Sequence, residues 1–431
     1  MTEKTVVVDT SVFIYDPQAL DSFSENKIVL PLAVLEELES LSKFRDESAK
    51  NSARALANIK VVLGETRGIV NEFVKLKNGA SFKVAVLPHR EGEQKNYRMT
   101  ILDLLKNILQ EDSSFMFMTK SLTRRVRAEA MGIETMDYEN QNFSFKSLYK
   151  GFRKIEVGKE SIDTFYKDRT MVVPPNLNPI SNEYFSMEAG ERDFALGRYD
   201  SSIGKIVGLL PLSKSVWGIE PLNLEQKFAL DLLLRDEIKL VSLMGQAGTG
   251  KTVLALAAAM KKVFGDRIYH RILISRPIVP LGKDIGFLPG VKEEKLMHWM
   301  QPIYDNLEFI FGLNGFNDFG ETFKDLIENK KIEMEALTYI RGRSLPNIVI
   351  IIDEAQNLTP HELKTIVSRA GKGTKIILTG DPTQIDSPYF DENSNGLTYL
   401  VGKFRNLPLY GHMFMEKTER SDLAAAAAHY L

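Results

Sequence analysis

Residues 243–260 read LMGQAGTGKTVLALAAAM, and this stretch decides the fold of the C-terminal half of the chain. An apolar run leads into a glycine-rich turn, which is followed by Lys251, Thr252 and an alanine-rich run typical of a helix. The turn fits the pattern G-x-x-x-x-G-K-[ST], in which glycines let backbone N–H groups turn inward around phosphates. The start of the following helix adds the positive end of its dipole. The stretch therefore predicts a nucleotide-phosphate site between a strand and a helix.

The residues of this turn have expected parts in holding ATP. Lys251 should reach the β- and γ-phosphates, and the Thr252 hydroxyl should ligate Mg²⁺. The apolar residues 238–244 read as the strand that precedes such a turn, which disfavours a chance match of the pattern. The residues expected to bind the nucleotide here are Gly245, Gln246, Ala247, Gly248, Thr249, Gly250, Lys251, Thr252 and Val253.

An acidic pair follows a second apolar segment about 100 residues later. Residues 348–352 are five consecutive β-branched residues, which is typical of a strand buried on both faces of a parallel sheet. Asp353 and Glu354 come directly after them. In phosphoryl-transfer sites, acids in such positions hold Mg²⁺ and act on the attacking nucleophile. We therefore expect Asp353 to be a metal ligand and Glu354 to be the general base.

Two glutamines flank the predicted site. Residues 374–386, TKIILTGDPTQID, read as a third buried strand and a polar loop that places Gln384 to sense the γ-phosphate or to orient the attacking water. Gln226 precedes the first strand, and its amide could read adenine as amides do in protein–DNA contacts. An ordinary helix start at Asn223 and Gln226 is the alternative explanation.

The composition indicates a folded, soluble protein of several domains. A chain of 431 residues predicts two to three domains of about 150 residues each. The absence of cysteine excludes disulfides, zinc–thiolate sites and a thiol nucleophile, and it suits a cytoplasmic protein. We find neither a signal peptide nor an apolar run of about 18 residues, so no membrane contact is expected. The net charge of −2 leaves only local basic patches for contacts with nucleic acid.

Strands and helices alternate in two blocks, residues 1–140 and 221–431, which predicts two α/β domains with mainly parallel sheets. Nucleotide should bind beyond the carboxyl ends of the second block's strands. Residues 141–220 differ, because they contain the proline- and asparagine-rich stretch MVVPPNLNPISNEYF and a hairpin-like stretch, FALGRYDSSIGKIVGLLP. We interpret them as a small β-rich connector.

The motifs GQAGTGKT, SRPIVPLGKDIGFLPG, IIDEAQNLTP and TGDPTQID together resemble the PhoH-type ATPases, which are related to superfamily 1 helicases. The resemblance covers residues 221–431. It implies a RecA-like P-loop NTPase with a parallel sheet, ATP hydrolysis coupled to RNA, and a homo-oligomer in the form of a hexameric ring. It places Arg276 in a loop near nucleotide or RNA. It makes Arg420 the candidate arginine finger, for which an ordinary surface arginine is the alternative.

Residues 1–140 resemble a PIN domain, the three-layer α/β fold of metal-dependent ribonucleases. The matching stretches are VVVDTSVFIYDP, LPLAVLEELESLSK, NSARAL and FMTKSLTRRVRAEAMGI. Together the two resemblances imply the architecture of the PIN–PhoH proteins over nearly the whole chain. A nuclease of this kind needs three or four carboxylates around Mg²⁺ or Mn²⁺, because hard cations prefer oxygen ligands and activate water there.

Two of the expected carboxylates are present. Asp9 ends the first predicted strand, and Glu37 stands in the stretch LEEL, with Glu36 as the alternative to it. These residues are the candidate metal ligands of a residual PIN site.

Two further carboxylates are missing. The third is expected just before the helix ILDLLKNIL, where Tyr97 and Arg98 stand instead. Asp103 comes about one turn later and would serve only if the register differs. The fourth is expected after Lys120, and that position is Ser121. We therefore interpret the nuclease site as degenerate.

Two basic groups are candidates for RNA contacts. One lies on the last predicted helix of the first block and could bind phosphates, or could be a solvated helix face. The other lies in the connector and adds an aromatic ring that could stack on a base, although a structural hairpin explains it equally well. The two groups are Lys120, Arg124, Arg125 and Arg127, and Arg192, Arg198 and Tyr199.

Three functions fit these residues. The leading hypothesis is an ATP-driven RNA helicase or translocase that acts on single-stranded RNA and carries a PIN-like domain. The second is an active PIN endoribonuclease to which the ATPase feeds RNA. The third is an ATP-switched RNA-binding or assembly protein that unwinds nothing.

Overall fold

The computed structural model describes residues 5–23, 26–44, 47–65, 72–76, 79–86, 101–111, 115–138, 148–190, 193–211, 214–277, 299–316, 318–337, 345–386 and 391–419. The chain divides into two compact units, Met1–Ser144 and Phe145–Leu431. No helix in these ranges is long and apolar enough to cross a membrane. The boundaries at residues 140 and 220 stay predictions.

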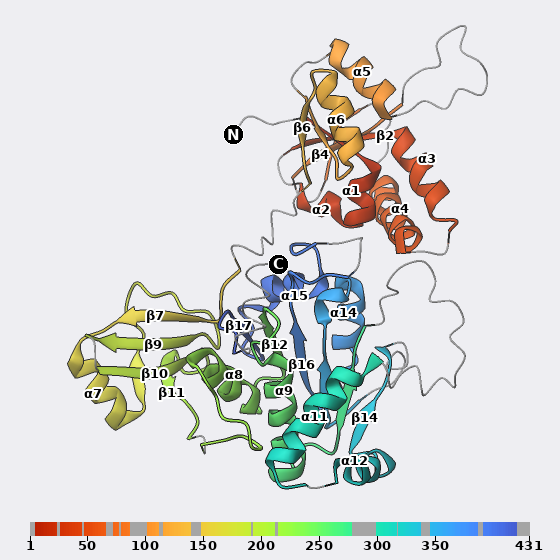
Figure 1. Ribbon diagram of the computed structural model, residues 1–431. Helices are drawn as coiled ribbons and strands as arrows, with labels where there is room; N and C mark the ends of the chain where they lie inside the picture. The colour runs from red at the N-terminus through yellow and green to blue at the C-terminus, as the bar shows by residue number, and fades with distance from the viewer. Residues whose placement is uncertain are drawn as a thin grey trace. The chain divides into compact units, whose positions relative to one another are not determined.

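The first unit is an α/β fold built on a six-stranded sheet (Figure 1). Its strands are β1 (Thr5–Val8), β2 (Lys27–Pro31), β3 (Val74–Lys75), β4 (Ser81–Ala85), β5 (Phe115–Met118) and β6 (Glu134–Met136). Its helices are α1 (Thr10–Tyr15), α2 (Ala19–Ser22), α3 (Leu32–Leu41), α4 (Glu47–Glu65), α5 (Ile101–Glu111) and α6 (Leu122–Ala130). The strand order is β3-β4-β2-β1-β5-β6, and all described pairs are parallel except β3 with β4. The carboxyl ends of β1, β2 and β5 therefore meet at one edge of the sheet.

The part of the second unit that contains the predicted phosphate loop, called here the nucleotide half, is built on a six-stranded, fully parallel sheet. Its strand order is β14-β13-β15-β16-β12-β17. These strands are β12 (Leu240–Gly245), β13 (Ile272–Ser275), β14 (Ile332–Met334), β15 (Val349–Ile352), β16 (Lys375–Gly380) and β17 (Tyr410–Met415). The helices around them are α8 (Leu224–Leu234), α9 (Lys251–Met260), α11 (Gln301–Leu313), α12 (Phe319–Glu328), α14 (Pro360–Val367) and α15 (Gly396–Phe404).

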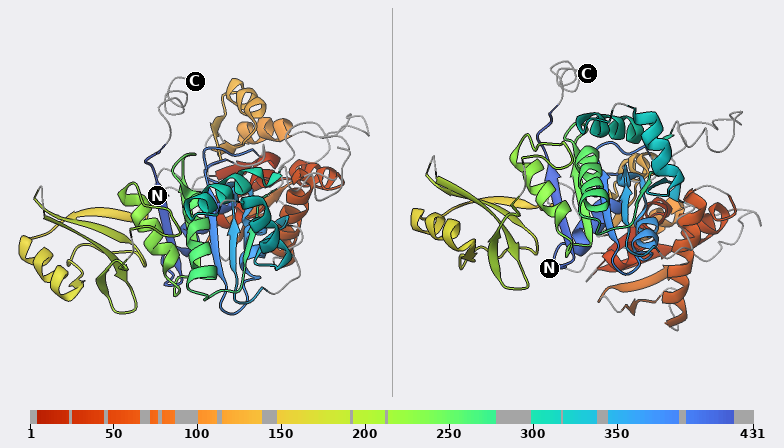
Figure 2. Two further views of the ribbon diagram at one scale, coloured as in Figure 1. Left: turned by 60° about the horizontal axis from the view of Figure 1, so that its bottom comes forward. Right: turned by 90° about the horizontal axis from the view of Figure 1, so that it is seen from below.

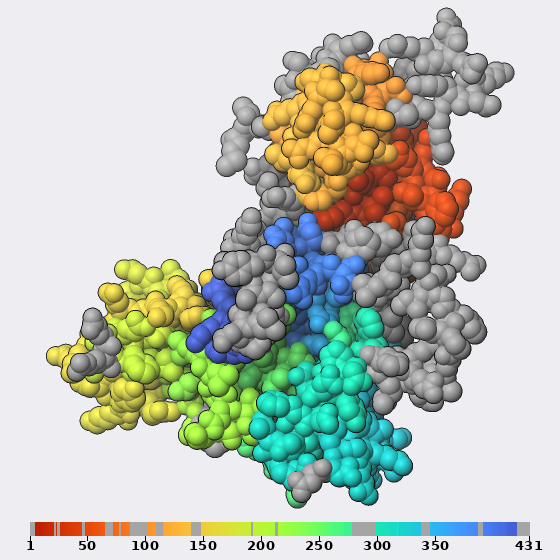
Figure 3. Space-filling model, in the orientation of Figure 1, coloured from red at the N-terminus to blue at the C-terminus, as the bar shows by residue number. Residues whose placement is uncertain are grey.

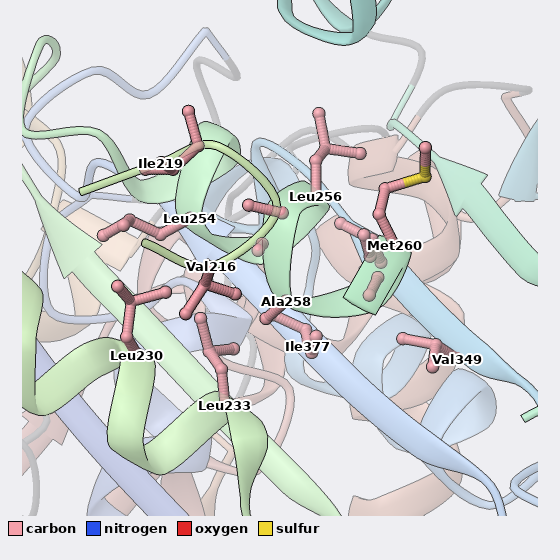
Figure 4. Packing of buried hydrophobic residues seen from close by; sticks show 14 of the residues in the cluster. Val216, Ile219, Leu230, Leu233, Leu254, Leu256, Ala258, Met260, Val349 and Ile377 are labelled. Carbon is pink, nitrogen blue, oxygen red and sulfur yellow. The ribbon is translucent and has the colours of Figure 1, made fainter. Parts of the chain in front are cut away.

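This sheet is buried on both faces, which explains its uninterrupted apolar strands. Val241 and Leu243 of β12 pack in a core with α8, α9 and α11, part of which is shown in Figure 4. Leu240 and Met244 of the same strand pack in a second core with α14 and α15. Successive side chains of a strand point to opposite faces, so the two cores lie on opposite sides of the sheet, as the helices in Figure 2 do. The predicted α/β fold class with parallel sheets is confirmed.

A smaller sheet lies beside this nucleotide half and forms the yellow-green lobe in Figure 3. Its order is β7-β9-β10-β11-β8, and its only described parallel pair is β7 with β9. The elements are β7 (Phe152–Glu156), α7 (Lys159–Asp168), β8 (Thr170–Val172), β9 (Tyr184–Ala189), β10 (Asp193–Asp200) and β11 (Lys205–Gly208). Buried bonds join it to the nucleotide half, since Tyr184 donates to Asp231 of α8 at 2.8 Å and Asn182 donates to the Tyr410 carbonyl at 2.7 Å.

Candidate nucleotide-binding site

The loop between β12 and α9 depends on glycine. Gly245, Gly248 and Gly250 have φ values of 148°, 84° and 90°, a region that other residues rarely adopt. A Cβ atom on Gly245 would also lie 2.0 Å from the Met415 carbonyl oxygen, so the neighbouring strand leaves no room for a side chain. The loop can therefore keep its backbone N–H groups turned toward a ligand.

A pocket of about 240 Å³ opens at the carboxyl ends of β12, β15 and β16. It is smaller than the roughly 300–1,000 Å³ typical of small-molecule sites, so it matches the phosphate end of a nucleotide rather than the whole molecule. It brings together the glycine-rich loop, the acidic pair and Gln384, which lie far apart in the sequence. Its lining residues are Ala247, Gly248, Gly250, Lys251, Thr252, Val253, Asn306, Asp353, Glu354, Gly380, Asp381 and Gln384.

Lys251 is buried at the start of α9. Its ammonium donates to the carbonyls of Gly245 and Gln246 at 2.7 and 2.8 Å, so it is held inside the loop that it is expected to serve. These two hydrogen bonds hold the ammonium in the loop, where a phosphate oxygen would bind.

The Thr252 hydroxyl and the Asp353 carboxylate meet across the pocket. The Thr252 Oγ1 donates to Asp353 Oδ1 at 2.9 Å, and the Thr379 Oγ1 donates to the same oxygen at 2.6 Å. Burial raises the pKa of the Asp353 carboxyl, and the negative charge of Glu354 raises it further. A hydroxyl and a carboxylate are hard oxygen ligands, and a cation would relieve the unfavourable burial of this charge. The residues therefore fit Mg²⁺.

Glu354 has a left-handed backbone, with φ 54°. Such a conformation costs a non-glycine residue about 1–3 kcal/mol, and residues that adopt it are enriched at functional sites. The strained residue is held by two side chains, because Arg276 Nη2 donates to Glu354 Oε1 at 2.9 Å and Gln356 Nε2 donates to its Oε2 at 2.6 Å. The Arg276 guanidinium lies 5.6 Å from the centre of the Trp299 ring. The structure thus brings Arg276 directly to the expected general base.

Sequence reasoning missed Asn306, which lines the pocket, and two residues that hold its loops, Asp381 and Gln356. Asp381 Oδ2 accepts a hydrogen bond from the Ala247 N–H of the glycine-rich loop at 3.1 Å. Gln356 donates to the Gln384 carbonyl at 2.9 Å and accepts from the Asp381 N–H at 3.1 Å, so it ties the Gln384 loop to the acidic pair. Asp381 could have been found from its position after a buried strand, which is the signal that identified Asp353.

Gln226 lies against the glycine-rich loop. It is buried, its Oε1 accepts from the Leu222 N–H at 2.8 Å, and its Nε2 donates to the Thr249 carbonyl at 3.2 Å. Asn223 caps the start of α8 by accepting from the Gln226 N–H at 3.0 Å. The helix-start explanation therefore holds for Asn223. The adenine contact of Gln226 stays a prediction.

The last described segment, residues 416–419, is attached to the same loop. The Glu419 N–H donates to the Gly248 carbonyl at 3.1 Å, and Asn223 Nδ2 donates to Glu419 Oε1 at 2.9 Å. Arg420 follows immediately but lies outside the described residues. Residues 278–298, which hold most of the motif SRPIVPLGKDIGFLPG, also lie outside them. The role of Arg420 as an arginine finger therefore stays a prediction.

In the first unit, Asp9 and Glu37 come together with Arg124 between them. Arg124 Nη1 donates to Asp9 Oδ1, and Arg124 Nη2 lies 2.9 Å from both oxygens of Glu37. Ser121 is the N-cap of α6, and Asp103 lies in the first turn of α5. Tyr97 and Arg98 are outside the described residues. Within the described part of the chain, no three His, Cys, Asp or Glu residues are grouped to hold a metal.

The remaining basic candidates are largely occupied by protein contacts. Lys120 Nζ lies 3.1 Å from Asp137 Oδ1. On the surface of α6, Arg125 Nε lies 3.0 Å from Glu129 Oε1. In the second unit, Arg198 is buried and donates to Asn182 and Asp200, which favours the structural explanation of that hairpin. Tyr199 packs beside α7, and Arg192 lies outside the described residues.

Comparison with known proteins agrees with this two-part architecture. Residues 218–429 match the family described as PhoH-like protein, and residues 6–139 match the PIN domain. The Bacillus subtilis (strain 168) Protein PhoH2 is 41% identical over 99% of this chain and 100% of its own length. The Protein PhoH2 of Mycolicibacterium smegmatis is 31% identical over 100% of this chain and 98% of its own length. The chain therefore belongs to the PhoH2 family, in which a PIN domain precedes a PhoH-type P-loop NTPase domain.

Proposed function

We propose that the protein is a Mg²⁺-dependent ATPase that remodels RNA as a helicase or translocase. The observation that carries the catalytic part is the single pocket in which the glycine-rich loop faces Asp353 and the strained Glu354. A P-loop alone would support only nucleotide binding. A buried carboxylate beside a hydroxyl, with a second carboxylate next to it, supports hydrolysis as well.

In this proposal one group of residues binds the phosphates and another group binds the metal ion. The loop N–H groups and Lys251 bind the β- and γ-phosphates, and Thr252 and Asp353 hold Mg²⁺. Bound there, Mg²⁺ would supply positive charge that neutralises the negative charge developing on the phosphate during transfer. Gln246 begins the loop directly after β12, and Val253 lies in the first turn of α9. Asp381 holds the Ala247 N–H at 3.1 Å and would have to release it to a phosphate oxygen.

Glu354 serves as the general base. It takes a proton from water while the water oxygen bonds to the γ-phosphorus and the bond to the ADP oxygen breaks. Arg276 Nη2 lies 2.9 Å from Glu354 Oε1 and so occupies one of the two oxygens that could accept the proton from water. In this proposal Arg276 turns toward the incoming phosphate and frees that oxygen. Gln384, held at its backbone by Gln356, lies at the same pocket and orients the water.

The RNA part of the proposal is supported by family membership, because a PIN domain is fused to a PhoH-type domain in one chain. We propose single-stranded RNA as the partner, in the cytoplasm. We also propose a homo-oligomeric, hexameric ring in which Arg420 reaches the nucleotide of a neighbouring subunit. The segment before Arg420 is bonded to Gly248, so movement of the loop would reach that arginine.

Steady-state ATP hydrolysis with and without single-stranded RNA tests the proposal, with Lys251→Ala as the control. We expect strong stimulation by RNA that disappears in the variant. Turnover that is indifferent to RNA would contradict an RNA-coupled motor and would favour an ATP-switched RNA-binding or assembly protein.

A further inference from the structure

The carboxylate site of the first unit contains its own cation. Arg124 reaches both acids from the first turn of α6, where the N-cap Ser121 accepts a hydrogen bond from the Arg124 N–H at 3.4 Å. The Asp9 side chain is fully buried, and the side chains of Arg124 and Glu37 are 30% and 35% exposed. The guanidinium is therefore packed into the site instead of lying on the solvent face of its helix.

Every carboxylate oxygen of the two acids is already engaged. Asp9 Oδ1 accepts from Arg124, and its Oδ2 accepts from Ser11 Oγ at 2.5 Å and from Thr119 Oγ1 at 2.6 Å. Both Glu37 oxygens accept from Arg124 at 2.9 Å, and Oε2 also accepts from Thr10 Oγ1 at 2.5 Å. A divalent ion would have to displace these donors to reach the oxygens.

The charges lead to the same conclusion. Two carboxylates alone would attract Mg²⁺ or Mn²⁺, but the guanidinium between them cancels half of their charge and would repel a divalent ion a few ångströms away. An arginine side chain stays protonated in proteins, so the guanidinium keeps its positive charge in this site. The residues of this site do not fit the metal that a PIN nuclease requires.

We propose that Arg124 takes the place of the catalytic metal in the PIN domain, as a fixed internal cation that holds Asp9 and Glu37 together and excludes divalent ions. This inference goes beyond the proposed function and gives a physical cause to the degenerate nuclease site that the sequence predicts. It is independent of the nucleotide site, which lies in the second unit.

The test is Mn²⁺ binding to the nucleotide-free, full-length protein, followed by the electron paramagnetic resonance signal of free Mn²⁺. The single variant Asp9→Asn should bind Mn²⁺ as the wild type does. Arg124→Leu removes the cation and should create one additional Mn²⁺ site. Mn²⁺ should bind at Asp9 and Glu37 in this variant on the order of tenfold or more tightly than it does at the same position in the wild type. Adding Asp9→Asn to Arg124→Leu should abolish the new site.

Three further variants make the result decisive. Arg125→Leu is the matched control, because Arg125 is the next residue of the same helix but pairs with Glu129 on the surface, and it should create no site. Arg124→Gln is the polar substitute if Arg124→Leu does not fold, and it should also gain the site. Ser121→Asp added to Arg124→Leu keeps a good N-cap and supplies a third carboxylate, so it should bind Mn²⁺ more tightly still.

Two results would overturn the proposal. One is wild-type Mn²⁺ binding that is lost in Asp9→Asn, which would show that the site accepts metal despite Arg124. The other is a folded Arg124→Leu or Arg124→Gln protein that gains no site, which would reduce Arg124 to an ordinary ion pair. Neither result depends on RNA-stimulated ATP turnover, so failure of the motor proposal remains distinguishable from failure of this one.

Discussion

His412 should make the stability of the second unit depend on pH. It is fully buried in β17, its Nδ1 lies 2.8 Å from Ser242 Oγ, and its ring centre lies 5.3 Å from that of Tyr149. Its Nε2 has no hydrogen-bond partner among the described residues. Burial lowers the pKa of His412 to about 3, although the hydrogen bond with Ser242 partly opposes this change. The folded protein therefore keeps this imidazole neutral.

The sign follows from the protons bound in each state. An unfolded histidine titrates near pH 6.5, so between pH 6.5 and about 3 the unfolded chain binds a proton that the folded chain does not. Stability is then lost as the pH falls, by about 1.4 kcal/mol per pH unit below 6.5. Between pH 7.5 and 5.0 the contribution of His412 to the free energy of unfolding should decrease by about 2 kcal/mol.

Urea unfolding of the wild type and of His412→Phe at the two pH values measures this difference. Phenylalanine keeps a ring beside Tyr149 and cannot take up the proton. The only two tryptophans of the chain, Trp217 and Trp299, both belong to the second unit, so their fluorescence reports its unfolding. The exposed His270, changed to Gln, is the matched control and should follow the wild type. Equal pH dependence in the wild type and His412→Phe would refute the reasoning.

Other predictions concern the nucleotide site. Gly245→Ala should lose binding of a fluorescent ATP analogue, because the new Cβ would lie 2.0 Å from the Met415 carbonyl oxygen. Gly312 lies in α11 with open space around it, so Gly312→Ala should bind the analogue normally and gain up to about 1 kcal/mol in stability. Normal binding by Gly245→Ala together with lost binding by Gly312→Ala would contradict this account of the packing. Glu354→Gln should bind ATP normally but hydrolyse it roughly 10²–10⁴-fold more slowly, and turnover near wild type would exclude Glu354 as the base.

The residues that follow the parallel strands of the nucleotide site could be predicted from the sequence, because each group of them has a local sequence signal. The glycine-rich loop has a fixed spacing, and Asp353 and Glu354 follow an uninterrupted run of β-branched residues. Parallel strands then bring their carboxyl ends to one edge without further information. The pocket that contains Lys251, Glu354 and Gln384 follows from these two facts.

Contacts between distant side chains could not be predicted in this way. Nothing in the hydrophobic pattern places Arg276 on Glu354, 78 residues away, or Asp381 on Ala247, 134 residues away. The first unit shows the same limit. Arg124 lies in a run of basic residues that reads as one surface, yet the structure turns it inward to Asp9, 115 residues away. The missing acid at Ser121, one turn earlier, was the available signal that the local charge balance had changed.

ATP-dependent displacement of a strand from an RNA duplex with a single-stranded tail tests the central claim most directly. The account predicts that the wild type releases the strand with Mg²⁺ and ATP. It also predicts no release with a non-hydrolysable ATP analogue, or by Glu354→Gln, although both should still bind nucleotide. No release by a wild-type protein that hydrolyses ATP in response to RNA would contradict the remodelling activity and would leave an ATP-switched RNA-binding protein.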